Sequence, residues 1–257
     1  MKRVWAVVLI FVLLFTLPAC SGIKLTDPDE IAKGQQTTVV DPLEPGDAPD
    51  FGEFLEEEEK KEEERKQQEE AARVEKEEQE SVPPRRGTVN KGVYTNDYIG
   101  VTFSSFGFLF YSNDEMCKMV GHDPAVYTVE NLVSVDSPVD SIYELMAVDM
   151  QNNNIVICYD NLAKSGFASY TEAQYLRSIY MAVSEEPGYT CDWEGRCTYK
   201  LGGVEFLMLP ATVETNGTTM TQGYLVKKYG KYFVQIIVTA APDAFTFILD
   251  SFSPIDG

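Results

Sequence analysis

The chain has 257 residues, of which 44% are hydrophobic, so it is long enough to build a folded domain with its own core. Its formal net charge of −20 repels phosphate backbones, which excludes nucleic acid as an expected partner. His122 is the sole histidine and no CxxC pair occurs, so we expect no metal site and no cofactor.

The chain begins with the pattern of an export signal. Lys2 and Arg3 form a short cationic start, and residues 4–17 are uncharged and apolar. This run is shorter than the ~20 residues that a helix needs to cross a bilayer, and it matches the hydrophobic segment of a secretory signal. The alternatives are a membrane helix or an ordinary signal peptide with an incidental cysteine.

The apolar run ends at Leu17-Pro18-Ala19-Cys20, which resembles the lipobox of bacterial lipoproteins. The resemblance implies cleavage between Ala19 and Cys20, so that residues 1–19 are a lipoprotein signal peptide. It also implies diacylglycerol on the Cys20 thiol. Two acyl chains hold a protein durably on a membrane. We therefore expect a lipid-anchored protein on the extracytoplasmic face of the cell membrane, with the membrane as a partner through Cys20.

A tether is predicted between the anchor and the folded part. Residues 20–50 mix Asp, Pro, Thr and Gly without hydrophobic periodicity and are expected to be a disordered linker. Residues 51–82 are rich in Glu and Lys, and their i,i+4 charge pairs favour a solvated helical spacer over a coiled coil. Residues 83–91 are expected to be a hinge. Whether 51–82 is a spacer of tuned length or a low-complexity linker stays open.

Residues 92–257 have the composition of one globular domain, in which runs of β-branched and aromatic residues predict a series of strands. The predicted strands are 98–103, 106–111, 142–150, 154–160, 197–201, 204–209, 223–229 and 232–240. Tight turns at 151–153, 202–203 and 230–231 separate three neighbouring pairs, which favours antiparallel hairpins.

Helix signals occur at three places in this domain. Ser112 and Glu115 match a capping box that opens a helix ending near Val120. A second match at Thr171 opens a helix with apolar residues at helical spacing. Pro242 fits the first turn of a third helix. Strands outnumber helices, which predicts an α+β fold with an antiparallel β-sheet covered by about three helices.

The segment from Val93 to Phe103, VYTNDYIGVTF, resembles the opening of small exported domains in Gram-positive, clostridia-type lipoproteins. Those domains are similar in organisation to the PsbP-like α/β sandwich, and the order of helices, hairpins and final sheet follows the same pattern. The resemblance implies a PsbP-like sandwich over about residues 92–253. It implies no defined catalytic residues.

Four cysteines remain besides Cys20. Cys191 and Cys197 bracket a five-residue loop, and this spacing favours a disulfide across a small hairpin. Cys117 and Cys158 have apolar neighbours and are expected to be buried thiols.

No catalytic motif stands out in the domain. Asp136, Asp140, Glu144 and Asp149 lie close in sequence, as paired carboxylates for acid–base chemistry would, but acids are frequent throughout and most are expected on the surface. His122 follows a predicted helix and is expected to cap or face solvent.

Aromatic residues give the stronger indication of binding. Trp193 lies between Asp192 and Glu194 in the loop between Cys191 and Cys197, and Tyr189 precedes that loop. We take Trp193 and Tyr189 as candidate binding residues, although aromatic side chains more often fill the core.

The sequence favours a non-enzymatic lipoprotein of the cell envelope, whose domain binds an envelope protein or a cell-wall component, or acts in assembly. The alternative is an envelope hydrolase that uses carboxylates.

Overall fold

The structure, a computed structural model, describes residues 82–104, 107–215 and 217–255. The signal segment, Cys20 and nearly all of the predicted linker and spacer lie outside the described residues. Within them, the chain forms two antiparallel sheets, four α-helices and one 3-10 helix. The predicted α+β class with mostly antiparallel strands is confirmed. The prediction of about three helices omitted α5 (Val129–Val133), because five residues are too few to show helical periodicity.

The larger sheet has eight strands in the order β4-β5-β6-β11-β10-β9-β7, with β8 also paired to β9. Its strands are β4 (Leu109–Ser112), β5 (Ser141–Val148), β6 (Asn154–Asn161), β7 (Tyr189–Cys191), β8 (Cys197–Leu201), β9 (Val204–Thr215), β10 (Thr218–Tyr229) and β11 (Tyr232–Ala240). The three predicted hairpins are present as β5–β6, β8–β9 and β10–β11. At their turns Asn152, Gly202 and Gly230 adopt positive φ, as tight turns require.

The smaller sheet has four strands in the order β1-β2-β3-β12. Its strands are β1 (Thr88–Asn90), β2 (Val93–Asn96), β3 (Val101–Ser104) and β12 (Phe252–Pro254). The end of the domain, β12, pairs with β3 from its beginning, and β1 uses residues that the sequence assigned to the hinge 83–91. Strand β3 overlaps the predicted strand 98–103. The other three strands have three or four residues each, so alternation over so short a run did not distinguish them from loops.

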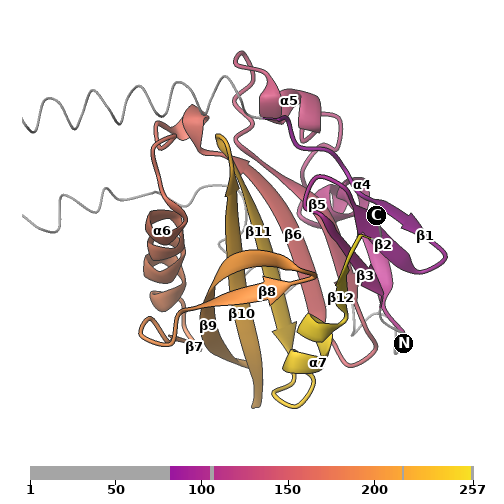
Figure 1. The fold of residues 1–257 in the computed structure, drawn as a ribbon, viewed down its shortest axis with the longest axis vertical. Helices are drawn as coiled ribbons and strands as arrows, with labels where there is room; N and C mark the ends of the chain where they lie inside the picture. The colour runs from indigo at the N-terminus through magenta and orange to yellow at the C-terminus, as the bar shows by residue number, and fades with distance from the viewer. Residues whose placement is uncertain (1–81, 105–106, 216, 256–257) are drawn as a thin grey trace, which may run out of the picture. The chain divides into compact units, whose positions relative to one another are not determined.

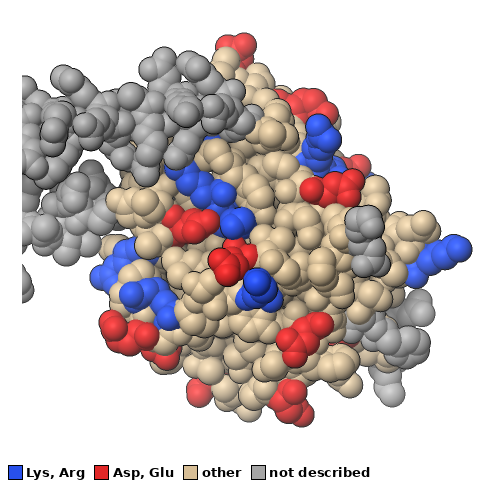
Figure 2. All heavy atoms as spheres, viewed as in Figure 1, with Lys and Arg blue, Asp and Glu red and all other residues tan. Residues whose placement is uncertain are grey.

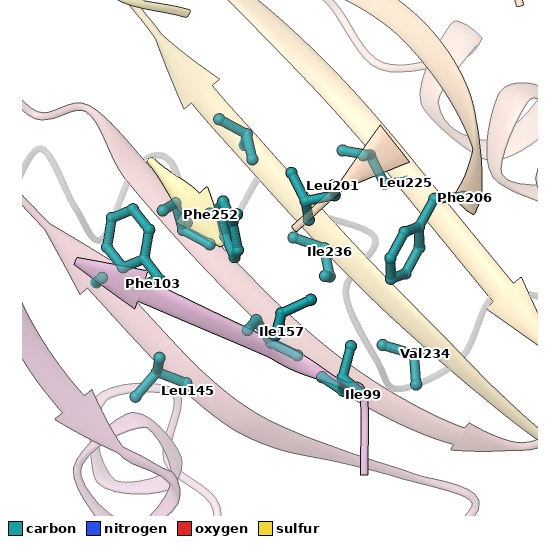
Figure 3. Close-up of a cluster of buried hydrophobic side chains, with 14 of the residues drawn as sticks. Ile99, Phe103, Leu145, Ile157, Leu201, Phe206, Leu225, Val234, Ile236 and Phe252 are labelled. Atoms are coloured by element: carbon teal, nitrogen blue, oxygen red, sulfur yellow. The ribbon is translucent and has the colours of Figure 1, made fainter. Parts of the chain in front are cut away.

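The main hydrophobic core lies between the two sheets. Phe103 and Phe252 of the smaller sheet have ring centroids 4.8 Å apart and face Ile157 and Ile236 of the larger sheet (Figure 3). Leu201, at the end of β8, joins the same cluster, and Figure 1 shows β8 crossing in front of β10 and β11. Each fully buried side chain of this size contributes about 1.5–3 kcal/mol to the free energy of folding. The packing between the two sheets is therefore the main source of stability in the domain.

The helices are α4 (Asn113–Met119), α5, α6 (Glu172–Ser184) and α7 (Phe245–Asp250), and the 3-10 helix is η1 (Leu162–Ser165). Both predicted capping boxes are present: Ser112 N donates to Glu115 at 2.8 Å, and Thr171 N donates to Gln174 at 2.8 Å. α6 packs on β7, β9 and β10, while α4 packs on β4 and β5. The third helix begins at Phe245, three residues after Pro242.

The disulfide predicted between Cys191 and Cys197 is absent, and both residues are free cysteines. β7 and β8 do not face each other as a hairpin, because both pair with β9. Cys191 lies opposite Ala211 and Cys197 lies opposite Met208. Three residues along a strand separate these positions by about 10 Å, whereas a disulfide joins Cα atoms about 4–7 Å apart.

Candidate functional site

A β-bulge places one carboxylate beside the segment that precedes β1. Along β5, Tyr143 pairs with Cys158 and Leu145 pairs with Ile157, so Glu144 is the extra residue of the bulge. A bulge redirects a side chain that would otherwise follow the alternation of the strand. The Glu144 side chain is 2% exposed and lies at a cleft bounded by β5, β4, the start of α4 and the segment before β1.

The Glu144 carboxylate is held by donors from two parts of the chain, the segment before β1 and strand β2. Its Oε1 accepts from the Gly87 amide at 2.6 Å, the Tyr94 hydroxyl at 3.1 Å and Asn96 Nδ2 at 3.3 Å. Its Oε2 accepts from Arg86 Nη1 at 3.4 Å, in an ion pair whose guanidinium is 33% exposed. Because unpaired buried carboxylates are costly, these donors are required for Glu144 to remain charged.

Burial raises the pKa of the Glu144 carboxyl above its ordinary value, and the Gly87 hydrogen bond and the Arg86 charge offset part of that rise. Burial also raises the pKa values of Tyr94 and Tyr159 well above that of free tyrosine. Both phenols are therefore neutral at physiological pH, and each can donate a hydrogen bond.

The hydrogen-bond network continues from Glu144 to the segment before β1. Asn96 Nδ2 donates to the Tyr159 hydroxyl at 2.6 Å, and that hydroxyl donates to the Arg85 carbonyl at 2.9 Å. Arg86 Nη1 also donates to the Tyr143 carbonyl at 3.0 Å. We call Arg85, Arg86 and Gly87 the strap, since these three consecutive residues are fastened to β5 and β6.

The cleft beside the strap has a volume of about 430 Å³, within the range of about 300–1,000 Å³ typical of small-molecule sites. Its lining combines strap residues, aromatic rings and acids. The lining residues are Arg86, Gly87, Val89, Tyr94, Phe110, Tyr111, Ser112, Asn113, Asp114, Glu115, Glu144 and Leu145.

Of the four carboxylates that the sequence singled out, Glu144 lines the cleft. Asp149 accepts from backbone and side-chain donors within its own β5–β6 turn, and Asp140 accepts from Ser165 at 3.1 Å. Asp136 is exposed in a loop. His122 follows α4 as expected, and its ring lies 4.3 Å from that of Tyr127.

Two acids of α4 that were not among the predicted site residues, Asp114 and Glu115, line the cleft together with Glu144. Their proximity depends on how α4 packs against β5, which the sequence does not encode locally. The sequence did carry a signal for Glu144, because it is an acid inside the apolar strand IYELMAV.

Trp193 and Tyr189 lie away from the cleft. Tyr189 is buried on β7, and Trp193 is half-buried in the loop between β7 and β8. The Trp193 ring packs against Tyr180 of α6 with centroids 5.1 Å apart, and the guanidinium groups of Arg177 and Arg196 lie 4.8 and 3.5 Å from its centroid. These contacts from its own chain occupy part of the ring surface that a ligand would use.

The described residues contain no group of three or more His, Cys, Asp and Glu side chains arranged to hold a metal ion. Among the helices of the described part of the chain, none has the length and apolar character needed to span a membrane. On the face toward the viewer, Figure 2 shows acidic and basic side chains interspersed rather than one broad basic area.

No protein-family model matches the chain, and no curated protein matches it by sequence. Among solved structures it is similar to LpqN, involved in cell envelope biogenesis of Mycobacterium tuberculosis, with 15% identity, a TM-score of 0.31, and coverage of 46% of this chain and 79% of LpqN. It is also similar to cyanobacterial PsbP (CyanoP) from Synechocystis sp. PCC 6803, with 12% identity, a TM-score of 0.35, and coverage of 66% of this chain and 98% of CyanoP. At these TM-scores the likeness carries no argument about function.

Proposed function

We propose that this protein is a lipoprotein of the cell envelope, anchored through acylated Cys20, whose domain binds an envelope protein or a cell-wall component without chemical turnover. The anchor is supported by the lipobox-like sequence from Leu17 to Cys20 after a signal-length apolar run. The net charge of −20 argues against nucleic acid as the partner.

The binding role is supported by the hydrogen bonds that hold Glu144. Oε1 of Glu144 accepts hydrogen bonds from Gly87, Tyr94 and Asn96, and Oε2 forms an ion pair with Arg86, so contacts within its own chain hold this carboxylate in place. Glu144 therefore joins the strap to the sheet, and the adjacent cleft offers a preformed surface for a ligand.

The anchor is tested by growing cells with an alkyne fatty-acid probe and comparing the wild-type chain with Cys20→Ala. We expect the label on the wild-type protein and its loss from the variant, which should collect in the medium or remain unprocessed. Equal labelling of both proteins would contradict the anchor. So would an intact mass that retains an unmodified initiator methionine.

A carboxylate hydrolase is the second candidate, because Glu144, Asp114 and Glu115 line one cleft and burial raises the pKa of Glu144. The two functions differ in whether the protein cleaves what it binds. Purified cell wall incubated with the protein should release no soluble fragments if the domain only binds. Fragment release that disappears in Glu144→Gln, with folding intact by circular dichroism, would replace the binding role with the enzymatic one.

A further inference from the structure

The buried carboxylate of Glu144 has unused acceptor capacity. Each oxygen of an ionised carboxylate can accept about two hydrogen bonds. Oε1 has three donors, from Gly87, Tyr94 and Asn96, whereas within the described residues Oε2 has Arg86 Nη1 alone, at 3.4 Å. Charge-assisted hydrogen bonds are normally about 2.7–2.9 Å long. Oε2 is therefore a buried anionic acceptor, at the cleft, that lacks a close donor.

The lining of the cleft carries more negative than positive charge. Among the described residues that line it, Glu144, Asp114 and Glu115 are acidic, and Arg86 is the one Lys or Arg. Arg86 pairs with Glu144, and Glu115 Oε2 is used by the backbone and hydroxyl of Ser112. Asp114 is exposed at the start of α4. A cation entering the cleft would therefore reduce the local excess of negative charge.

Aromatic rings supply the remaining surface. Tyr94, Phe110 and Tyr111 line the cleft beside the acids, and Tyr111 and Phe110 are half-buried. Aromatic faces attract ammonium groups, and the attraction grows as the pair is removed from water. Rings also cover the apolar part of a ligand.

We propose that this cleft binds a primary ammonium group, with Glu144 Oε2 as its hydrogen-bond acceptor and Asp114 as a second negative charge at the entrance. The inference rests on the proposed binding function and names its ligand class. The N–H groups matter as well as the charge, because the acceptor is buried and needs a donor. The ammonium group belongs to a lysine side chain of a peptide or to a small free amine, and these two sources share the same chemistry.

Isothermal titration calorimetry of the full-length chain in detergent tests the inference, with acetyl-Ala-Lys-Ala-amide and spermidine as separate probes. We expect at least one probe to bind, and the tighter of the two to identify the source. The same peptide with trimethyl-lysine keeps the charge but has no N–H on that nitrogen, so it should bind about tenfold more weakly or worse. Raising the salt concentration should weaken binding, since the contact is electrostatic.

Three variants locate the binding site. Glu144→Gln should weaken the lysine probe by about tenfold or more, because it replaces a charged acceptor with a neutral one. Asp114→Asn should weaken it about threefold, as expected for an exposed charge. Asp136→Asn makes the same change of charge on an exposed loop outside the cleft and should leave affinity unchanged.

Several outcomes would overturn the ammonium site: no binding of either probe, equal affinity for lysine and trimethyl-lysine, or no effect of the cleft variants relative to Asp136→Asn. Circular dichroism would show whether Glu144→Gln loosens the strap and unfolds the domain. If it does, the affinity of Asp114→Asn for the lysine probe tests the ammonium site instead. If neither probe binds but Cys20 is still labelled and the domain still binds cell wall or an envelope protein, only the ammonium site is contradicted. Loss of the Cys20 label would instead contradict the proposed anchor.

Discussion

Asp160 is a second buried acid, and it differs from Glu144 in its surroundings. It lies on β6 against α6, where it accepts a hydrogen bond from the Tyr175 hydroxyl. Burial raises its pKa from 3.8 to about 6, and the Tyr175 hydrogen bond offsets part of that rise. Because the folded state favours the protonated form, this group makes the domain more stable at low pH than at high pH.

We predict that Asp160→Asn stabilises the domain above pH 6 and removes a pH dependence. As pH rises through about 4 to 6, wild-type Asp160 loses a proton that the folded state holds more tightly than the unfolded chain. The rise of the Asp160 pKa from 3.8 to about 6 corresponds to about 3 kcal/mol, which is lost from the free energy of unfolding over that window. Asn keeps an oxygen for Tyr175 and does not ionise.

Urea unfolding at about pH 4 and about pH 7.5 measures this effect. Asp136→Asn, an exposed acid, is the matched control and should behave as the wild type does. The prediction fails if Asp160→Asn and the wild type lose the same free energy between the two pH values.

At the scale of elements, strand register decides the chemistry of the loop between β7 and β8. We predict that Cys191 and Cys197 stay reduced in the purified protein, because their positions along β9 are about 10 Å apart and, at an odd separation, point to opposite faces. Alkylation in denaturant without reductant, followed by peptide mass mapping, should modify both thiols. A peptide pair that is linked until reductant is added would contradict the register.

The turn between β8 and β9 is also where the two sheets meet. Gly202 has φ of +54°, and a Cβ there would lie 2.8 Å from the Ser253 carbonyl oxygen of β12. We predict that Gly202→Ala lowers the free energy of unfolding by about 2–4 kcal/mol, because it adds a backbone collision to the cost of a left-handed conformation.

Gly217→Ala separates these two contributions. Gly217 has φ of +76° but nothing within 4 Å of its added Cβ, so this variant should lose only about 1–2 kcal/mol. Chemical unfolding of both variants provides the comparison. Equal losses would mean that the approach of the β8–β9 turn to β12 does not matter for stability.

At the scale of the whole molecule, charge controls which partners can approach. The chain carries 41 acidic and 21 basic residues, so long-range repulsion opposes any polyanion. We predict that the full-length protein leaves the mobility of a labelled DNA duplex unchanged in a gel at about 50 mM salt, where non-specific electrostatic binding is strong. A shifted band that disappears at higher salt would contradict this expectation.

In the folded domain, the strap connects the segment before β1 to the larger sheet. The strap lies within residues 83–91, the predicted hinge between spacer and domain, and it is fastened to β5 and β6 through Glu144 and Tyr159. Arg86 and Gly87 of the strap also line the cleft. From the sequence alone this stretch was predicted to be a hinge, because Pro83-Pro84 and the two arginines that follow show no local pattern that indicates packing against the sheet.

Much of the fold followed from local sequence signals. The capping residues Ser112 and Thr171 mark helix starts because capping uses neighbouring backbone groups, and the turn at Gly202-Gly203 marks a hairpin because its φ values suit glycine. Long strands such as β11 follow from composition alone. The antiparallel class of the sheets was predictable from these signals together.

Tertiary structure decided the candidate site and the thiols. The bulge at Glu144, the position of α4 acids beside it and the separation of Cys191 from Cys197 all depend on which strands pair and in what register. Strand register is set by side chains that are distant in sequence and that pack together between the two sheets. A shift of the register by one residue would move every side chain of a strand to the other face. The sequence by itself determined the net charge, which depends on composition alone, and the local elements, which depend on neighbouring residues, and it predicted an export signal. The cleft exists only where distant segments meet.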